Sequence, residues 1–159
     1  MMKRLPTLLA AVAAMASVTT AALPTPTLQL PAGTTLTSAT PAQLEAAVRD
    51  LATSTPSAVA GELRRVFAAR QSEHDAQLMT TLLSGALHAL GKSPQSSVVN
   101  MILSVTLTYY PNEVLVVVNT AVQNTPAAYA PLIVSTAVAA NPQTSPQHAE
   151  EIASAAHAA

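Results

Sequence analysis

Three kinds of residue are rare or missing in this 159-residue sequence, and each shortage excludes a class of protein. There is no cysteine, so disulfide bonds, a thiolate nucleophile and a lipid anchor on an N-terminal cysteine are excluded. Tryptophan is absent, and the aromatic residues are one phenylalanine and three tyrosines. Charged residues make up 9% of the chain, against about a quarter in a typical soluble domain. The core must therefore be built from leucine, valine and isoleucine, with the abundant alanine allowing helices to approach closely.

The few charged residues are weighted toward acidic ones. The whole chain carries seven basic and eight acidic residues, a net charge of -1. Without the first 22 residues, which include Lys3 and Arg4, five basic residues remain against all eight acidic ones, a net charge of -3. Phosphate binding needs a surplus of lysine and arginine on one face. We therefore expect no nucleic-acid partner.

Residues 1–22 have the three-part pattern of a secretory signal peptide. A short basic start (MMKR) precedes an apolar run over residues 5–16 and a stretch of small residues over 17–22. The final Thr-Ala-Ala satisfies the small-x-small rule of signal peptidase, which predicts cleavage before Leu23. The alternative is an uncleaved membrane anchor, but the apolar run is shorter than the roughly 20 residues of a spanning helix. We expect export to the periplasm or the extracellular space.

Residues 23–39 (LPTPTLQLPAGTTLTSA) contain three prolines, a glycine and no charge. Prolines this closely spaced prevent a helix, so the segment is predicted to be a linker or an extended arm. The rest of the chain, residues 40–159, is predicted to be one helical domain.

Repeated helix starts are the clearest pattern within residues 40–159. A small polar residue followed by proline is typical of a helix N-terminus, because the first caps free N–H groups and the second has no N–H to satisfy. Six such pairs occur at roughly the spacing of short helices: Thr40-Pro41, Thr55-Pro56, Ser93-Pro94, Thr125-Pro126, Asn141-Pro142 and Ser145-Pro146.

Apolar residues recur at helical spacing between these starts, most clearly over 44–51 and 59–67. A third helix is predicted to begin at Ser72 or Glu73 and to end at Gly91, since glycine commonly follows the last turn of a helix.

The segment over 94–122 permits a second interpretation, because its many β-branched residues also suit strands. We predict helices there, since the spacing matches the first half of the chain. LVVVNTAVQNTP (115–126) also resembles LIVSTAVAANP (132–142) in residue order, and single helices of this size must stack on one another to be stable. The predicted fold class is all-α: short, proline-capped helices stacked as antiparallel hairpins, in a solenoid-like repeat or an irregular bundle.

Between Ser93 and Gln147 the only charged residue is Glu113. Such a segment is either the core of the domain, a protein interface or a surface in contact with a membrane. No apolar run is long enough for a spanning helix. The residues expected to belong to the core or to an interface are Val98, Ile102, Val118 and Ile133.

Residues able to carry chemistry do not form a recognisable catalytic or metal-binding pattern. His74 and His88 are too far apart on one helix to share an ion, and His148 with Glu151 gives only two ligands. Ser84 and His88 lack an orienting acid, so Ser84 is expected to bond its own backbone and His88 to be solvated.

Two charged groups have simple structural interpretations. The sequence Glu73-His74-Asp75 is expected to complement a helix N-terminus. Arg64, Arg65 and Arg70 are expected to form a solvated basic face that pairs with Glu62, with Glu62, Arg64 and Arg65 pointing outward.

The sequence thus predicts no catalytic, cofactor-binding or metal-binding residues. It favours an exported, non-enzymatic helical scaffold or protein-binding module, with another protein or a second copy of the chain as partner. A cell-envelope structural or membrane-associated helical protein is the alternative, and an enzyme without a recognisable motif is the third possibility.

Overall fold

The computed structural model describes residues 26–141 and 146–158, within which every regular element is helical. The α-helices are α1 (Pro41–Ser54), α2 (Val59–Ala69), α3 (Ala76–Ala89), α4 (Ser96–Tyr109), α5 (Val114–Asn124), α6 (Ala130–Ala140) and α7 (Pro146–Ala158). The predicted all-α fold is confirmed, including helices rather than strands in the valine-rich segment over 94–122. The predicted signal peptide and Leu23 lie outside the described residues.

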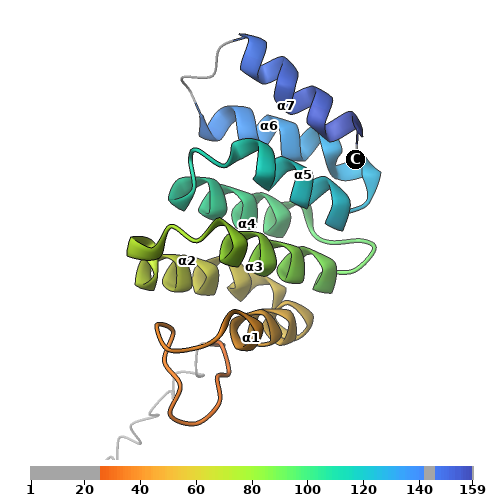
Figure 1. Cartoon of the computed structure of the whole chain (residues 1–159). Helices are drawn as coiled ribbons and strands as arrows, with labels where there is room; N and C mark the ends of the chain where they lie inside the picture. The colour runs from red at the N-terminus through yellow and green to blue at the C-terminus, as the bar shows by residue number, and fades with distance from the viewer. Residues whose placement is uncertain (1–25, 142–145, 159) are drawn as a thin grey trace, which may run out of the picture.

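The helices stack in two layers, each made of alternate helices (Figure 1). In one layer α1 packs against α3, α3 against α5, and α5 against α7. In the other, α2 packs against α4 and α4 against α6. Consecutive helices also contact one another, so each hairpin spans both layers. This arrangement is that of a short solenoid, in which every hairpin is buried by its neighbours.

Local capping explains where the helices start. Thr40 accepts a hydrogen bond from the backbone N–H of Gln43, and the Gln43 side chain accepts one from the Thr40 N–H, which together form a capping box. Pro56 opens a 3₁₀ turn (Pro56–Ala58) that leads directly into α2. Pro94 instead lies two residues before α4, whose N-cap is Gln95. The small-polar–proline pairs thus mark helix starts to within a few residues.

The predicted start of the third helix was wrong by three or four residues. Gln71–Glu73 forms a separate 3₁₀ turn, and His74 is left-handed with φ 43°, which breaks the helical path. Asp75 then caps α3 by accepting hydrogen bonds from the N–H groups of Gln77 and Leu78 at 2.9 and 3.0 Å. At the other end, Gly91 has φ 76° and closes the helix as predicted.

The core is aliphatic and runs the length of the stack. Val98, Ile102, Val118 and Ile133 are at most 2% exposed and lie in this core. Phe67 is also fully enclosed, with its ring centroid 5.2 Å from that of Tyr110 in an edge-to-face arrangement.

Polar side chains join alternate helices within each layer. The Ser84 hydroxyl of α3 donates to the side-chain oxygen of Asn124 of α5 at 3.0 Å. In the other layer, the Thr136 hydroxyl of α6 donates to the side-chain oxygen of Asn100 of α4 at 2.8 Å. The expectation that Ser84 bonds its own backbone was therefore wrong, because a neighbouring helix supplies an acceptor within reach. His88 is exposed, as expected.

The arm before α1 folds back on α2 and is held there by two charged side chains. The Glu62 carboxylate accepts a hydrogen bond from the Leu28 N–H at 3.3 Å, and the Arg70 guanidinium donates to the carbonyl oxygens of Leu36, Thr37 and Ala39. Leu28 and Leu36 pack against the core.

Two expectations about these charges were wrong. Glu62 and Arg70 are each only 7% exposed, whereas Glu62 was expected to point outward and Arg70 to be solvated. Glu62 does pair with Arg65, at 2.8 Å. Both side chains are buried because the arm covers this face of α2, and helical periodicity gives no information on what covers a face.

Helix α7 closes the opposite end of the stack. It contacts both α5 and α6, burying Ile152 and Ala156, while Glu150 and Ser154 on its other side are exposed. A polar outer face is typical of the last repeat of a solenoid. None of the helices in the described part of the chain is long and apolar enough to cross a membrane.

Candidate binding site at the loop edge

One edge of the stack brings together the turns that precede α3 and α5, and Asn141, which follows α6. We call it the loop edge and define it as residues 70–75, residues 110–113 and Asn141. Helices α4 and α6 end here, and α3 and α5 begin here. Two adjoining hollows of about 320 and 430 Å³ open at this edge, and they share Pro111, Asn112 and Glu113.

The first hollow, of about 320 Å³, is lined mainly by aromatic and ionisable side chains, those of His74, Tyr109, Tyr110 and Glu113, together with Pro111 and Asn112. Tyr110 is 7% exposed, and its ring is held edge-to-face against Phe67. Its hydroxyl forms no hydrogen bond with the described residues. Every fully enclosed side-chain oxygen among those residues has a hydrogen-bond partner, so the Tyr110 oxygen is not one of the enclosed atoms. The Tyr110 ring is thus buried while its hydroxyl stays accessible at the hollow.

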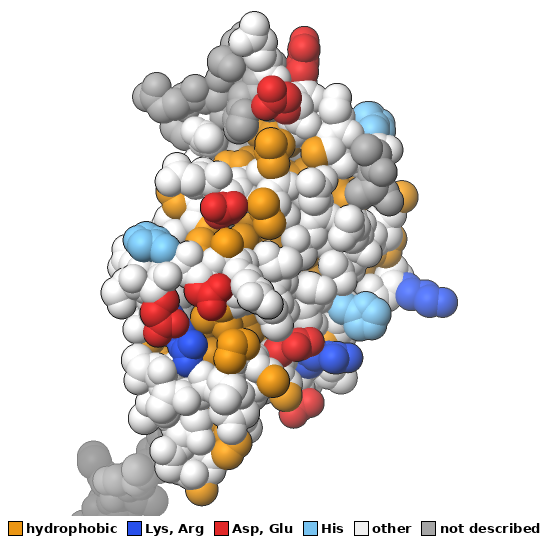
Figure 2. All heavy atoms as spheres, in the orientation of Figure 1, with side chains coloured by type: hydrophobic (Ala, Val, Ile, Leu, Met, Phe, Trp, Pro, Cys, Tyr) orange, Lys and Arg blue, Asp and Glu red, His pale blue; other side chains and the backbone are white. Residues whose placement is uncertain are grey.

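Glu113 is the one carboxylate among the residues that line this hollow, and two further carboxylates act on Tyr110 from nearby. Burial raises the pKa of the Tyr110 hydroxyl, and the negative charges of Asp75 and then Glu73 raise it further. Glu113 stands directly before α5 and lines both hollows. Acidic side chains are visible on this side of the molecule, with a histidine and a basic side chain among them (Figure 2).

Of the three carboxylates, one is balanced by a nearby cation. Glu73 pairs with Arg70 at 3.4 Å. Neither Asp75 nor Glu113 forms an ion pair with another described residue. The hollow is therefore electronegative.

His74 is held in the left-handed region, which costs a non-glycine residue about 1–3 kcal/mol. It is exposed and lines the first hollow. Backbone strain of this kind is concentrated at functional sites in proteins.

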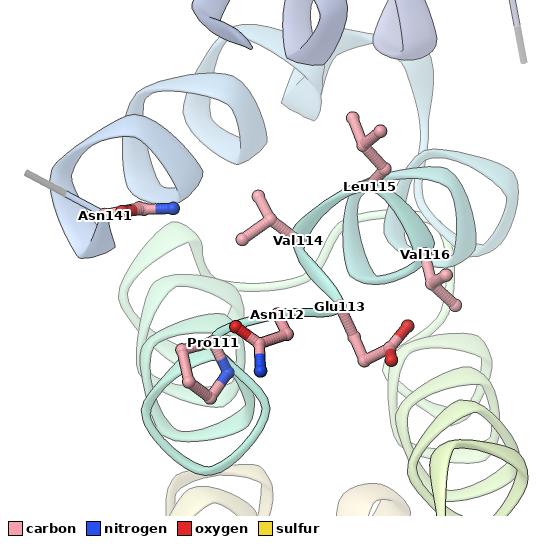
Figure 3. Close-up of a pocket in the computed structure, with 7 residues that line it drawn as sticks. All are labelled: Pro111, Asn112, Glu113, Val114, Leu115, Val116 and Asn141. Atoms are coloured by element: carbon pink, nitrogen blue, oxygen red, sulfur yellow. The ribbon is translucent and has the colours of Figure 1, made fainter. Parts of the chain in front are cut away.

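The second hollow, of about 430 Å³, combines an apolar wall with polar groups (Figure 3). The side chains of Asn112 and Glu113 point away from those of Val114 and Leu115, and the Asn141 amide points toward Val114 (Figure 3). Val116 also lines this hollow, is 39% exposed and points away from Val114 and Leu115 (Figure 3).

Three other hollows in the described part of the chain lack this mixture of groups. One of about 370 Å³ beside α1 is lined by Arg49, Asp50, Thr53 and two alanines, with no aromatic side chain. A groove of about 330 Å³ between α4 and α6 is lined by Asn100, Ser104, Thr108, Thr136 and two alanines, with no ionisable group. A hollow of about 660 Å³ beside α7 is lined mainly by alanine and valine, and His157 is its one ionisable side chain. The loop edge therefore has the most varied recognition chemistry.

The residues singled out from the sequence do not form this site. Val98, Ile102, Val118 and Ile133 are all enclosed in the core, and none lines either hollow. The sequence did contain a signal for the loop edge: Tyr109 and Tyr110 are adjacent aromatics in an aromatic-poor chain, and Glu113 is the one charge between Ser93 and Gln147.

Metal binding finds no support in the described residues, since no three of their histidine, aspartate or glutamate side chains are grouped closely enough to hold an ion. The side chain of His148 lies outside the described residues, and with it the pair of His148 and Glu151 that the sequence offered. Comparison with protein-family models, curated proteins and solved structures finds no match for this chain.

Proposed function

We propose that this chain is an exported, non-enzymatic helical scaffold that binds another protein through the loop edge. The observation that supports this function is the pair of adjoining hollows that share Pro111, Asn112 and Glu113. They combine an apolar wall with amide, carboxylate and phenol groups at the rim. Protein interfaces are typically built in this way, with an apolar centre and a polar surround enriched in tyrosine.

The solenoid explains why such a surface would be rigid. Each turn at the loop edge connects helices that are packed into both layers, so the positions of the turns are fixed by the core. Functional groups are commonly carried on loops that a rigid scaffold positions. The Phe67 contact holds the Tyr110 ring in place before any partner arrives, which lowers the entropy cost of binding.

Site-specific cross-linking tests this function. A photoreactive amino acid is placed at Asn112, which is exposed and lines both hollows, and a control is placed at Glu150 on the outer face of α7. We expect one protein, identified by mass spectrometry, to cross-link from position 112 and not from 150. Val116→Asp should abolish that cross-link without changing the helical circular dichroism spectrum. Equal cross-linking from both positions, or capture unaffected by Val116→Asp, would contradict the proposal.

A further inference from the structure

Tyr110 has an environment that a purely structural tyrosine does not need. Its ring packs against Phe67 in the core, yet its hydroxyl has no hydrogen-bond partner among the described residues although the side chain is only 7% exposed. The remaining tyrosine outside this hollow, Tyr129, donates its hydroxyl to the carbonyl oxygen of Pro94. The Tyr110 hydroxyl is not fully enclosed, so it is available to a partner from outside.

The groups around this hydroxyl determine which partner fits. Asp75 uses one carboxylate oxygen, Oδ1, to cap α3, and its other oxygen has no hydrogen bond with the described residues. Glu113 makes no side-chain capping bond to α5. The hollow therefore presents acceptors from three of its lining residues: the Glu113 carboxylate, the Tyr110 oxygen and the amide oxygen of Asn112. The Asp75 carboxylate is not part of the lining but is close enough for its charge to act on the Tyr110 hydroxyl.

Two helix N-termini oppose a bound cation here, because α3 and α5 both begin at the loop edge and each carries a partial positive charge. Asp75 offsets the first by bonding the N–H groups of Gln77 and Leu78. Two full negative charges, on Asp75 and Glu113, exceed two partial positive ones of about half a charge each. The remaining excess is negative.

We infer that the first hollow of the loop edge binds the cationic side chain of a lysine or arginine in the protein partner. The inference deepens the proposed function and rests on it. The Asp75 and Glu113 carboxylates attract the cation, the Tyr110 oxygen and the Asn112 amide accept its N–H groups, and the Tyr109 and Tyr110 rings provide faces for cation–π contact.

A side chain of a protein fits better than a free amine because the two hollows adjoin and share Pro111, Asn112 and Glu113. The first is electronegative and aromatic, and the second has an apolar wall on which Val116 is the exposed side chain. A basic residue in the first would place its neighbours in the partner against that wall. The partner segment therefore has a lysine or arginine beside apolar residues.

A peptide titration followed by nuclear magnetic resonance tests this. The probes are the blocked peptide acetyl-Ala-Lys-Val-Leu-Ala-amide, the same peptide with uncharged norleucine in place of lysine, and n-butylammonium alone. We expect the lysine peptide, at millimolar concentration, to shift the amide signals of Tyr109, Tyr110, Asn112 and Glu113 saturably. The norleucine peptide should bind at least tenfold more weakly, since a hydrogen bond to a charged group is worth roughly that factor. n-Butylammonium keeps the charge but lacks the apolar neighbours, so it should also bind about tenfold more weakly.

Variants separate charge recognition from folding. Glu113→Gln should weaken the lysine peptide about tenfold, while Glu150→Gln on the exposed face of α7 should leave it unchanged. Tyr110→Phe keeps the ring contact with Phe67 and should weaken binding about tenfold, as expected for one hydrogen bond to the cation. Equal binding of the lysine and norleucine peptides, shifts elsewhere in the molecule, or no binding at all would overturn the inference. Binding of n-butylammonium as tight as that of the peptide would show a free-amine site and would overturn the partner segment.

The two proposals fail in different ways. A partner captured from position 112 whose capture is insensitive to Glu113→Gln would overturn the cation site and leave the proposed function standing. Saturable binding of the lysine peptide, together with no partner captured from position 112, would support the cation site and overturn the protein-binding function.

Discussion

Replacement of Ile102 by alanine tests whether the uncharged central helices form the core of a single chain. Ile102 lies on α4 with none of its surface exposed. Its loss removes three carbons from the core, at roughly 0.8 kcal/mol each or about 2.4 kcal/mol in total. A residual cavity of some 50 Å³ would add about 1.2 kcal/mol. We expect the free energy of unfolding to fall by about 3–4 kcal/mol, within the usual range for this substitution.

Met101 provides the matched control. It is the preceding residue of the same helix and is 41% exposed, so Met101→Ala should cost about 0.5–1 kcal/mol at most. Both variants are compared with the wild type by urea unfolding, which gives the free energy directly. Val118, also fully enclosed, should respond to truncation in the same direction as Ile102, by about 2–3 kcal/mol.

The competing interpretation is that these residues form an interface between chains. In that case Ile102→Ala would leave the unfolding of the isolated chain unchanged and would alter self-association instead. Sedimentation velocity of the same samples separates the two cases. Unchanged unfolding together with altered sedimentation would refute the core assignment.

Four further predictions concern the arm, the glycines, the tyrosine hydroxyl and the leader. Arg70→Met removes the guanidinium that binds three carbonyl oxygens of the arm. Amide hydrogen exchange over residues 28–39 should therefore accelerate at least tenfold, while exchange in α4 stays unchanged. Exchange rates over the arm equal to those of the wild type would contradict this role of Arg70. Gly61→Ala should stabilise the protein by about 0.5–1 kcal/mol, because Gly61 is helical and nothing lies near the added methyl group. Gly91→Ala should destabilise it by about 1 kcal/mol, because Gly91 has φ 76°. Melting temperatures that change in the same direction for both variants would contradict these reasons. The pKa of Tyr110 is raised from 10.0, so the native state holds the phenol proton more tightly than the unfolded state does. The resulting contribution to the free energy of unfolding is complete below pH 10.0 and is lost as the pH rises through the raised pKa. Tyr110→Phe should therefore flatten the dependence of that free energy on pH in this range, as measured by urea unfolding. Intact mass of exported protein should give an N-terminus at Leu23 or within a few residues of it, and a chain that still begins with Met1 would refute cleavage.

The helical fold could be predicted from the sequence because its determinants are local. Thr40 with Pro41, Asp75, and Gly91 each act on the few residues beside them, and they appear in the structure as caps or stops. His74 was the exception, since a left-handed histidine has no sequence signature and it delayed the start of α3.

The environments of single polar residues could not be predicted, because they depend on segments distant in sequence. Arg70 is 31–34 residues from the carbonyl groups that it binds, and Ser84 is 40 residues from Asn124. Tyr110 faces Asp75 and Glu73 only because the stack places two turns side by side. The loop edge was missed for the same reason.

The alternation of contacts between two layers has a consequence for how the chain acquires its structure. Among the described helices, the extensive contacts join elements one or two places apart along the chain. No terminal segment has to wait for the opposite end before it packs, and such short-range contacts are associated with fast folding. A chain that emerges from a channel one segment at a time could therefore complete each hairpin in turn, with α7 adding the last layer after α5 and α6 are already in place.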